Sequence, residues 1–443
     1  MTRRSPACRT GTLALVLLAA PVSAQDVSLA EDFKQAYRVE VRVKLSGKLA
    51  VPVEKGKPPQ VLDLAGASRV VYDERVLPPD DGALVSVRSY RDVEFKRTMG
   101  NSTQDTGIRP SVRRMVVRAA NGKNVPFSPD GPLTFGEIDV VKSDVFSQVA
   151  VPGLLPARAV RTGDTWKASA AAVTELSGME KIEAGDLTVE FLGTTEVDRK
   201  RVAKLKVAGV LRGVDQDGPG KLKLDATAYF DLDAKMLTYL SVKGTHEMLD
   251  GSGQTMGLYE GLSVTTRTPV ALPADLSDAS LRGLDLKPTA ENTLLLFDNP
   301  GLGVRFLHPR GWRVGAIQGN QVTVLHSSDA VGMLLTVMPA AKVPTAEAYL
   351  QENTAFLQKE KAEVAVAAKP ERVRTEPVQL DRFAVEAKFA ADKVQRLEYA
   401  VLRQAEGGAT VAATLPSAAV NDLKGEVERI IRSLAVTKTI EPK

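Results

Sequence analysis

Hydrophobic and polar residues alternate with a period of two along several stretches of the N-terminal half. From Tyr37 to Val51 the odd-numbered positions are mostly apolar and the even-numbered positions are mostly charged or polar. The same pattern recurs from Lys221 to Leu232. Because successive side chains of a strand point to opposite faces, this pattern predicts long antiparallel strands with one buried and one solvated face.

Five such strands follow one another between residues 186 and 268. Short clusters rich in Asp, Gly, Pro and Lys separate them, and these connections are too short for a crossover helix, so the pattern predicts an up-and-down meander. The expected bounds are 187–195, 201–213, 220–232, 236–248 and 254–268. Strands this long exceed the usual length. The sheet must therefore coil, and we expect a curved, open antiparallel sheet shaped like half of a barrel.

Two helices are expected in this half. Thr134 and Glu137 have the spacing of a capping box, and apolar residues follow at helical intervals, which predicts a helix over 134–149. A second, alanine-rich helix is expected over 168–177. A sheet with one apolar face needs a covering layer, so one or both helices should lie on that face.

The periodicity disappears between Pro269 and Pro288, where Pro, Asp and Ser dominate. Such composition is typical of a linker or a domain edge. We therefore expect a linker at 269–290 that joins a β-sheet domain over 26–268 to a second domain over 291–437.

The second domain has the order strands, helix, strands, helix, which indicates an α+β fold within a mainly β chain. One helix is expected over 345–361, with Thr345 as N-cap and Phe356 on its apolar side, and a closing helix over 418–433, with Ser417 as N-cap. The expected strands are 293–297, 302–308, 321–327, 331–338, 372–380, 383–391, 394–403 and 409–414.

The run from Asp298 to Trp312, which reads DNPGLGVRFLHPRGW, resembles the opening of PsbP-like domains. The chain departs from that pattern at Val304, where Phe is common, and at His308, where Tyr is common. The resemblance extends to the terminal helix that ends at Leu434. It implies an antiparallel sheet with flanking helices, and roles in binding or assembly more often than in catalysis.

A fainter likeness concerns the N-terminal half. The segments 127–134 and 160–166, which read FSPDGPLT and VRTGDTW, resemble parts of uncharacterised secreted bacterial β-proteins. This likeness implies a shape and no activity.

Both tryptophans follow a turn that contains glycine. An aromatic side chain after a tight turn usually fixes the turn to a core. We therefore expect structural anchors rather than ligand contacts at six positions, namely Gly163, Asp164, Trp166, Pro309, Gly311 and Trp312.

Residues 1–24 contain three arginines, an apolar run and small residues before Gln25, which is typical of a secretory signal peptide cleaved after Ala24. We expect an exported protein, periplasmic or extracellular. The apolar run is too short to span a bilayer, and no later stretch is long enough. Cys8 precedes the apolar run and is the sequence's single cysteine, so the mature chain has no thiol, disulfide or cysteine-bound metal.

Composition narrows the choice of partners. The 443 residues carry a formal charge of +4, which falls to +1 when the three arginines of the signal peptide are removed. The basic residues are interspersed with acids, and only 5% of the residues are aromatic. Nucleic acid is therefore not an expected partner.

No motif assigns a catalytic, cofactor-binding or metal-binding residue. His246 opens a His-Glu-x-x-His-like run that ends in Asp250 and lies on an expected strand, where no helical turn brings two ligands together. Asp215 and Asp217 precede Gly218 as in a turn and lack the further ligands of a calcium loop. No Gly-x-Ser-x-Gly elbow occurs.

These features predict an exported, non-enzymatic binding protein without cofactors. Its partner is expected to be a hydrophobic small molecule, such as a lipid or acyl chain on the concave sheet face, or an envelope protein. The alternative is an extracytoplasmic hydrolase with catalytic carboxylates dispersed along the chain, since sequence spacing does not reveal such pairs.

Overall fold

The computed structural model describes residues 26–51, 59–78, 84–120, 123–143, 150–215, 218–328, 331–375, 378–389 and 393–438. The expected signal peptide, residues 1–24, lies outside the described residues. Within these ranges, no helix has the length and apolar character needed to span a membrane.

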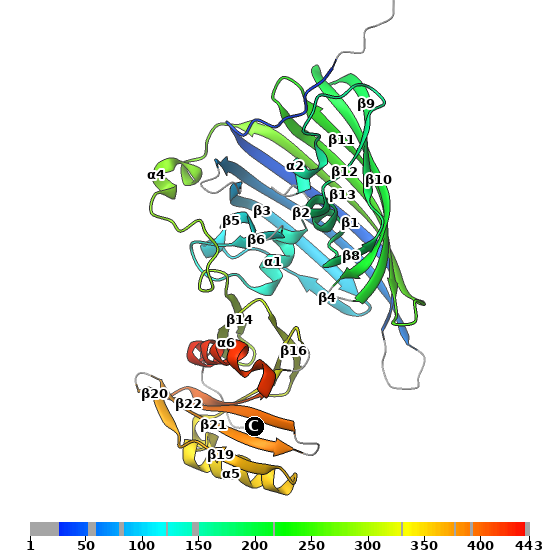
Figure 1. Ribbon diagram of the computed structural model, residues 1–443. Helices are drawn as coiled ribbons and strands as arrows, with labels where there is room; N and C mark the ends of the chain where they lie inside the picture. The colour runs from blue at the N-terminus through cyan, green and yellow to red at the C-terminus, as the bar shows by residue number, and fades with distance from the viewer. Residues whose placement is uncertain are drawn as a thin grey trace, which may run out of the picture.

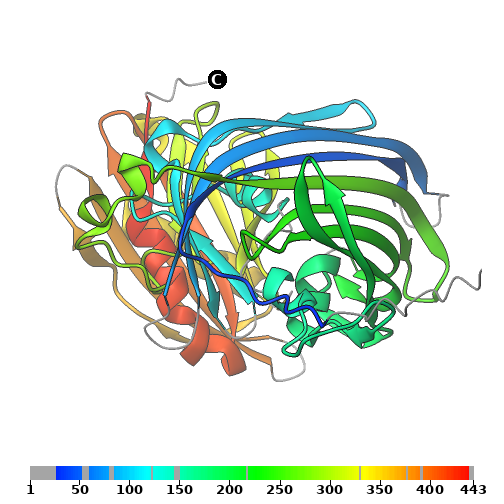
Figure 2. The same ribbon diagram turned by 90° about the horizontal axis from the view of Figure 1, so that it is seen from above.

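The N-terminal half forms one large antiparallel sheet with the strand order β6-β5-β3-β2-β1-β13-β12-β11-β10-β9-β7. Two short strands lie beside this path, β4 next to β3 and β8 next to β10. Among the described residues the edge strands β6 and β7 do not pair with each other, so the sheet is open. It is strongly curved, as the view from above shows (Figure 2). The strands are β1 (Ala36–Val51), β2 (Gln60–Leu77), β3 (Val85–Met99), β4 (Ser102–Asp105), β5 (Arg114–Ala120), β6 (Lys123–Phe127), β7 (Thr165–Lys167), β8 (Lys181–Ala184), β9 (Leu187–Val197), β10 (Lys200–Asp215), β11 (Gly218–Asp231), β12 (Met236–Leu249) and β13 (Thr255–Val270).

The meander expected from the sequence is confirmed as strands β9 to β13, each paired with its neighbour along the chain. The first strand, β1, then pairs with the last, β13, from Ala36 opposite Val270 to Leu49 opposite Gly257. This pairing places β1 in the middle of the sheet and joins the meander to strands β2 and β3. Alternation along β1 is as predicted, because Val39 and Val41 are buried and the charged residues between and beyond them are more exposed.

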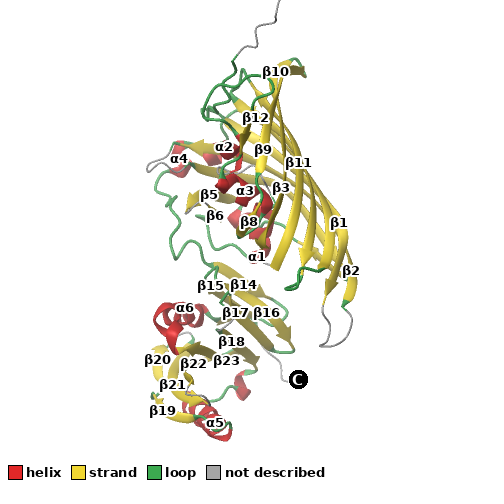
Figure 3. Ribbon diagram, turned by 45° about the vertical axis from the view of Figure 1, so that its right-hand side comes forward, coloured by secondary structure: helices red, strands yellow, loops and turns green. Residues whose placement is uncertain are grey.

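Helices α1 (Phe135–Lys142), α2 (Ala150–Leu154) and α3 (Ala170–Ser177) lie together on the concave side of the sheet (Figure 3). Helix α1 begins with the predicted capping box, in which Thr134 accepts from the backbone of Glu137 and the Glu137 side chain accepts from the backbone of Thr134. It ends earlier than expected, and residues 144–149 lie outside the described residues. Helix α3 confirms the second predicted helix.

The segment at 269–290 begins with the end of β13 and contains a 3-10 turn, η2 (Ala274–Leu276), and a short helix, α4 (Asp278–Leu281). Leu276 and Leu281 are buried against strands β3, β5 and β6 of the large sheet. Residues 269–290 therefore pack on the N-terminal half, although their sequence has no helix or strand periodicity.

The C-terminal half contains two antiparallel sheets, with the orders β14-β15-β24 and β16-β17-β18-β23-β22-β21-β19. Strand β20 lies beside β21. Helix α6 packs on the eight-stranded sheet through a buried apolar stripe, and helix α5 covers β19 and β21. The elements are β14 (Leu295–Asn299), β15 (Val304–His308), β16 (Trp312–Gln318), β17 (Gln321–His326), β18 (Gly332–Met338), η3 (Ala340–Lys342), α5 (Ala346–Lys359), β19 (Glu363–Ala367), β20 (Glu371–Arg374), β21 (Gln379–Phe389), β22 (Lys393–Gln404), β23 (Gly407–Pro416), η5 (Ser417–Ala419), α6 (Val420–Ser433) and β24 (Ala435–Val436).

Several expectations for this half need correction. Ser417 does not cap α6; it opens a 3-10 turn, and its hydroxyl donates to the carbonyl of Val394 at 2.6 Å. The expected strand over 372–380 is split between β20 and β21, and β16 and β19 were not predicted. Thr345 caps α5 as expected, but Phe356 is 58% exposed rather than part of its buried side.

The two halves touch through a few specific contacts (Figure 1). Leu295 of β14 forms a bridge with Leu133 and is part of the apolar core beneath α1. Arg310 donates to the carbonyl oxygens of Thr293, at 3.1 Å, and of Pro126 on β6. Burial lowers the pKa of Arg310 to about 10.

Candidate functional site

The concave face of the large sheet carries an apolar groove, defined by two adjoining cavities of about 780 and 490 Å³. The outer cavity lies at the strand ends near the β12–β13 turn, and the inner cavity reaches under the C-terminal ends of α1 and α3. Tyr259 lines both cavities. Each volume falls within the usual range of ligand sites.

The outer cavity is lined mainly by aliphatic and methionine side chains from five strands, β1, β2, β3, β12 and β13. Methionine is flexible and polarizable, so it adapts to ligands of varied shape. Apart from Tyr259, its large apolar residues are Leu45, Leu49, Val51, Leu64, Met99, Met248, Leu249 and Met256. None of these residues belongs to a core cluster of the described residues, so their apolar surface is not used to hold the sheet and helices together.

The groove lies between two separate cores. Helix α1 packs on β1, β2, β3 and β5, whereas α2 and α3 pack on β9 to β12. Between these two contact areas, strands β12, β13 and β1 present their inner face to the cavities. The covering helices therefore leave a strip of the concave face open.

Glycines on the inner face of the sheet leave space above this open strip, because they have no side chains. A Cβ atom at Gly220 would lie 2.7 Å from Nε2 of His246, and one at Gly257 would lie 2.8 Å from Leu49. A Cβ atom at Gly66 would lie 2.9 Å from Leu45. Large side chains thus lie across glycine positions of neighbouring strands instead of standing upright, which leaves room above them.

Gly261 differs from the other inner-face glycines. A Cβ atom at this position would have the carbonyl oxygen of Lys44 as its nearest neighbour, at 3.9 Å. A side chain here would meet open space and extend into the inner cavity, whose wall includes Gly261. This position therefore offers a way to fill the groove without disturbing the sheet.

A line of polar side chains crosses the floor of the groove. The register places His246 on β12 opposite Tyr259 on β13, and the Tyr259 hydroxyl forms a hydrogen bond with Nδ1 of His246. On its other side, Nε2 of His246 lies 3.5 Å from a carboxylate oxygen of Asp215 at the end of β10. His246 reaches across β11 because Gly220 has no side chain in its way.

The helix ends add charged groups to the wall of the inner cavity. Burial raises the pKa of the Asp139 carboxyl on α1, and the positive charges of Arg97 and Lys142 oppose that shift. Arg97 lies 3.9 Å from Asp139, and Glu175 on α3 accepts from the side chain of Asn124 at 2.5 Å. Each acid of the inner cavity therefore has a neighbour of its own.

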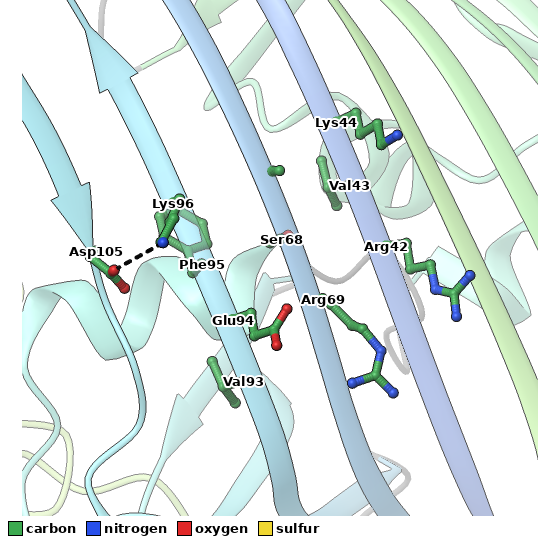
Figure 4. A pocket seen from close by; sticks show the side chains of 11 residues that line it. Arg42, Val43, Lys44, Ser68, Arg69, Val93, Glu94, Phe95, Lys96 and Asp105 are labelled. Atoms are coloured by element: carbon green, nitrogen blue, oxygen red, sulfur yellow. Dashed lines mark ion pairs between the residues drawn. The ribbon is translucent and has the colours of Figure 1, made fainter.

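A second depression lies on strands β1, β2 and β3 and is rich in charge (Figure 4). Arg42 and Arg69 both contact Glu40 at 2.8 Å, and Lys96 lies 3.7 Å from Asp105. Arg42, Arg69 and Lys96 there are matched by acids, and exposed ion pairs of this kind contribute little to stability. This depression is therefore a weaker candidate than the groove.

A buried ion-pair network lies away from the groove. Arg267 contacts Glu31 at 3.0 Å and Glu74 at 3.2 Å, and Glu74 also contacts Arg88 at 3.3 Å. Burial raises the pKa of Glu31, whereas at Glu74 the two arginines outweigh burial and lower the pKa. No cavity described above includes these side chains, so the network ties the N-terminal segment to the sheet.

The predicted anchors near Trp166 lie together at the β7 edge. Gly163 has a φ of 91° and its N–H donates to Phe191 at 2.8 Å. The Asp164 carboxylate accepts from Arg158 at 2.9 Å, and this hydrogen bond lowers the pKa of Asp164. Trp166 is half-buried, packs against the core under α3, and donates to the carbonyl of Leu154 at 2.9 Å.

The predicted anchors near Trp312 lie in the C-terminal core. The Pro309 carbonyl accepts from the backbone of Trp312 at 3.0 Å, which closes the turn. Gly311 lies beside His326, because a Cβ atom there would be 3.0 Å from its ring. Trp312 is 1% exposed, and its indole N–H donates to Glu426 at 2.7 Å. Neither tryptophan lines the groove.

The remaining chemical candidates are placed as follows. His246 lies on a strand, as expected, and is buried in the floor of the groove. Asp217 lies outside the described residues. Within the described ranges, no group of three or more His, Cys, Asp or Glu side chains is placed to hold a metal ion.

Sequence reasoning missed Tyr259 and the pairing of His246 with Asp215. A signal was present, because Gly47 stands at an apolar-face position of the alternating strand β1, and Gly257 and Gly261 flank Tyr259 on one face of β13. Glycine in a strand interior often marks a close approach of backbone or ligand.

No family model matches the sequence, and no curated protein matches it. Among solved structures, the chain is similar to cyanobacterial PsbP (CyanoP) from Synechocystis, with 14% identity over 32% of this chain and 92% of that chain and a TM-score of 0.27. The Ran-binding protein Mog1p from Saccharomyces cerevisiae is 10% identical over 33% of this chain and 96% of that chain, with a TM-score of 0.26. Lipovitellin, in a structure concerned with lipid–protein interactions, is 10% identical over 55% of this chain and 27% of that chain, with a TM-score of 0.33. These are weak likenesses of parts of the fold.

Proposed function

We propose that this protein is an exported carrier whose groove holds one apolar or amphiphilic ligand, such as a lipid or an acyl chain. The observation that carries the proposal is the open strip of the concave face, where aliphatic and methionine side chains line the outer cavity without joining either core. Exposed apolar surface gathered in a concavity is costly in water and favours an apolar ligand.

The glycine floor supports the same role. Glycine weakens a strand, so a row of glycines on the buried face of a sheet costs stability. This loss of stability is offset if a ligand fills the space above the glycines. In this chain the space is the groove itself, where Gly244 and Gly261 lie in the wall of the inner cavity.

The arrangement of acids favours a carrier over a hydrolase with dispersed carboxylates. A glycosidase-type mechanism needs two carboxylates that face one reacting point. Asp139, Glu175 and Asp215 come from three different elements, and each has a separate neighbour in Arg97, Asn124 or His246.

Export is part of the proposal and rests on residues 1–24, whose pattern is that of a signal peptide. A carrier outside the cytoplasm would meet lipids that have left a membrane. The mature chain would begin at Gln25.

The test uses the mature chain and the apolar fluorophore N-phenylnaphthylamine, whose emission rises in an apolar site. The wild-type protein is expected to bind the fluorophore saturably. Gly261→Leu, which fills the inner cavity, should weaken binding about tenfold or more, equivalent to about 1.4 kcal/mol. Thr266→Leu adds the same side chain at an exposed position of the same strand and should leave binding unchanged.

Circular dichroism and thermal melts of both variants show whether the fold is kept. Absence of saturable binding by the wild-type protein would reject the carrier. Equal binding by wild type and a folded Gly261→Leu variant would show that the fluorophore does not occupy the inner cavity and would remove that cavity from the proposal.

A further inference from the structure

Asp215, His246 and Tyr259 form a polar line on the groove floor, and the two neighbours of His246 decide which of its ring nitrogens carries the proton. A neutral imidazole carries its proton on one nitrogen and accepts on the other. The carboxylate of Asp215, 3.5 Å from Nε2, favours the proton on Nε2. Nδ1 is then the acceptor, and the Tyr259 hydroxyl donates its proton to it.

In this arrangement the hydroxyl proton of Tyr259 is donated to His246. Toward the groove, the hydroxyl oxygen can therefore act as a hydrogen-bond acceptor. Tyr259 lines both cavities and therefore lies where they adjoin. A ligand whose chain occupies the apolar outer cavity can place its polar group beside this oxygen. A polar group that donates a hydrogen bond fits the site, and one that can only accept does not.

The charged residues in the cavity walls also disfavour a carboxylate ligand. The inner cavity has three acids in its wall, Asp139, Glu175 and Asp215, and one lysine, Lys142. Arg97, in the wall of the outer cavity, lies beside Asp139. A carboxylate ligand next to Asp215 would meet a like charge in a partly desolvated site, which is unfavourable.

We propose that the groove selects single-chain amphiphiles with a hydrogen-bond-donating polar group, an alcohol or amine, over fatty acids. The Tyr259 hydroxyl oxygen accepts the hydrogen bond from this group. The inference rests on the proposed carrier function and adds the ligand class. Asp215 acts as a positioning residue, because its charge favours the proton on Nε2 of His246, and from the wall of the inner cavity it also repels a carboxylate.

The test measures displacement of N-phenylnaphthylamine at neutral pH by three ligands with the same chain, hexadecanol, hexadecylamine and hexadecanoic acid. The wild-type protein should bind the alcohol and the amine about tenfold more tightly than the acid. Tyr259→Phe keeps the ring and removes the hydroxyl, so this preference should shrink to about twofold or less. Asp215→Asn should improve binding of the acid.

Tyr239→Phe is the matched control, because Tyr239 also lies on the sheet but stacks on Tyr229 and lines neither cavity. It should retain the wild-type preference. Equal displacement by all three ligands, or an unchanged preference in Tyr259→Phe, would overturn the inference and leave the carrier standing. A wild-type protein that binds neither fluorophore nor ligands would overturn both, so the two failures can be told apart.

Discussion

Replacement of Trp312 by alanine should destabilise the C-terminal half. The indole is 1% exposed and packs in the core formed by strands β15 to β18, β22, β23 and helix α6. Its ring also meets the His326 ring edge-on at 5.3 Å, and its N–H donates to Glu426 at 2.7 Å. Trp312→Ala therefore removes a large buried ring, a ring contact and a charge-assisted hydrogen bond.

The expected loss follows from these contacts. Removing a buried tryptophan ring costs about 3–5 kcal/mol. The lost hydrogen bond adds about 1 kcal/mol, because Glu426 is only half-buried and can turn to water. A total loss of about 4–6 kcal/mol in the free energy of unfolding corresponds to a thermal unfolding midpoint lowered by roughly 10–20 °C for a domain of this size. Trp312→Phe keeps a ring and should cost about 1–3 kcal/mol.

The two tryptophans make the assay specific for each half. In Trp312→Ala the remaining tryptophan is Trp166, in the N-terminal half, so fluorescence follows that half while circular dichroism follows the whole chain. The expected result is an early transition by circular dichroism that Trp166 does not report. An unchanged midpoint together with lost ligand binding would refute the structural role and make Trp312 a contact residue.

Three further predictions concern the sheet, helix α1 and the N-terminus. Gly47→Ala should destabilise the protein by about 1–3 kcal/mol in urea unfolding, because its Cβ would lie 2.3 Å from the Leu258 carbonyl oxygen, whereas Gly261→Ala should be nearly neutral. Burial of the Glu137 carboxylate opposes ionisation, but hydrogen bonds from the Arg109 side chain and from two backbone N–H groups outweigh burial and lower its pKa. The ionised Glu137 therefore stabilises the fold above the ordinary pKa of 4.5, and this stabilisation is lost as the pH falls through the folded-state pKa. Glu137→Gln should therefore lower stability at neutral pH and reduce its loss between neutral and acid pH, as urea unfolding at a series of pH values would show; parallel curves for the two proteins would contradict this. N-terminal sequencing of the exported protein should begin at Gln25, and an intact signal segment on the protein at its normal location would contradict export.

Local structure was predictable wherever one short-range pattern decided it. Strands β9 to β13 and β1 were found by alternation, and the start of α1 was found from Thr134 and Glu137, because a capping box needs only residues three apart. Strand β16 was missed because most of its residues are exposed, so no alternation marks it. Ser417 was misread because its hydroxyl bonds to β22, a partner that local sequence does not show.

The sequence by itself determined which face of strands β1 and β11 is apolar, since side-chain direction has a period of two whatever the partner strand. It did not determine which strands become neighbours. Only the tertiary structure paired β1 with β13, which placed Gly47 and Tyr259 opposite each other, and brought Asp215 to His246 across β11. The groove and its polar line depend on that register, because a shift of one residue would turn His246 and Tyr259 to the convex face.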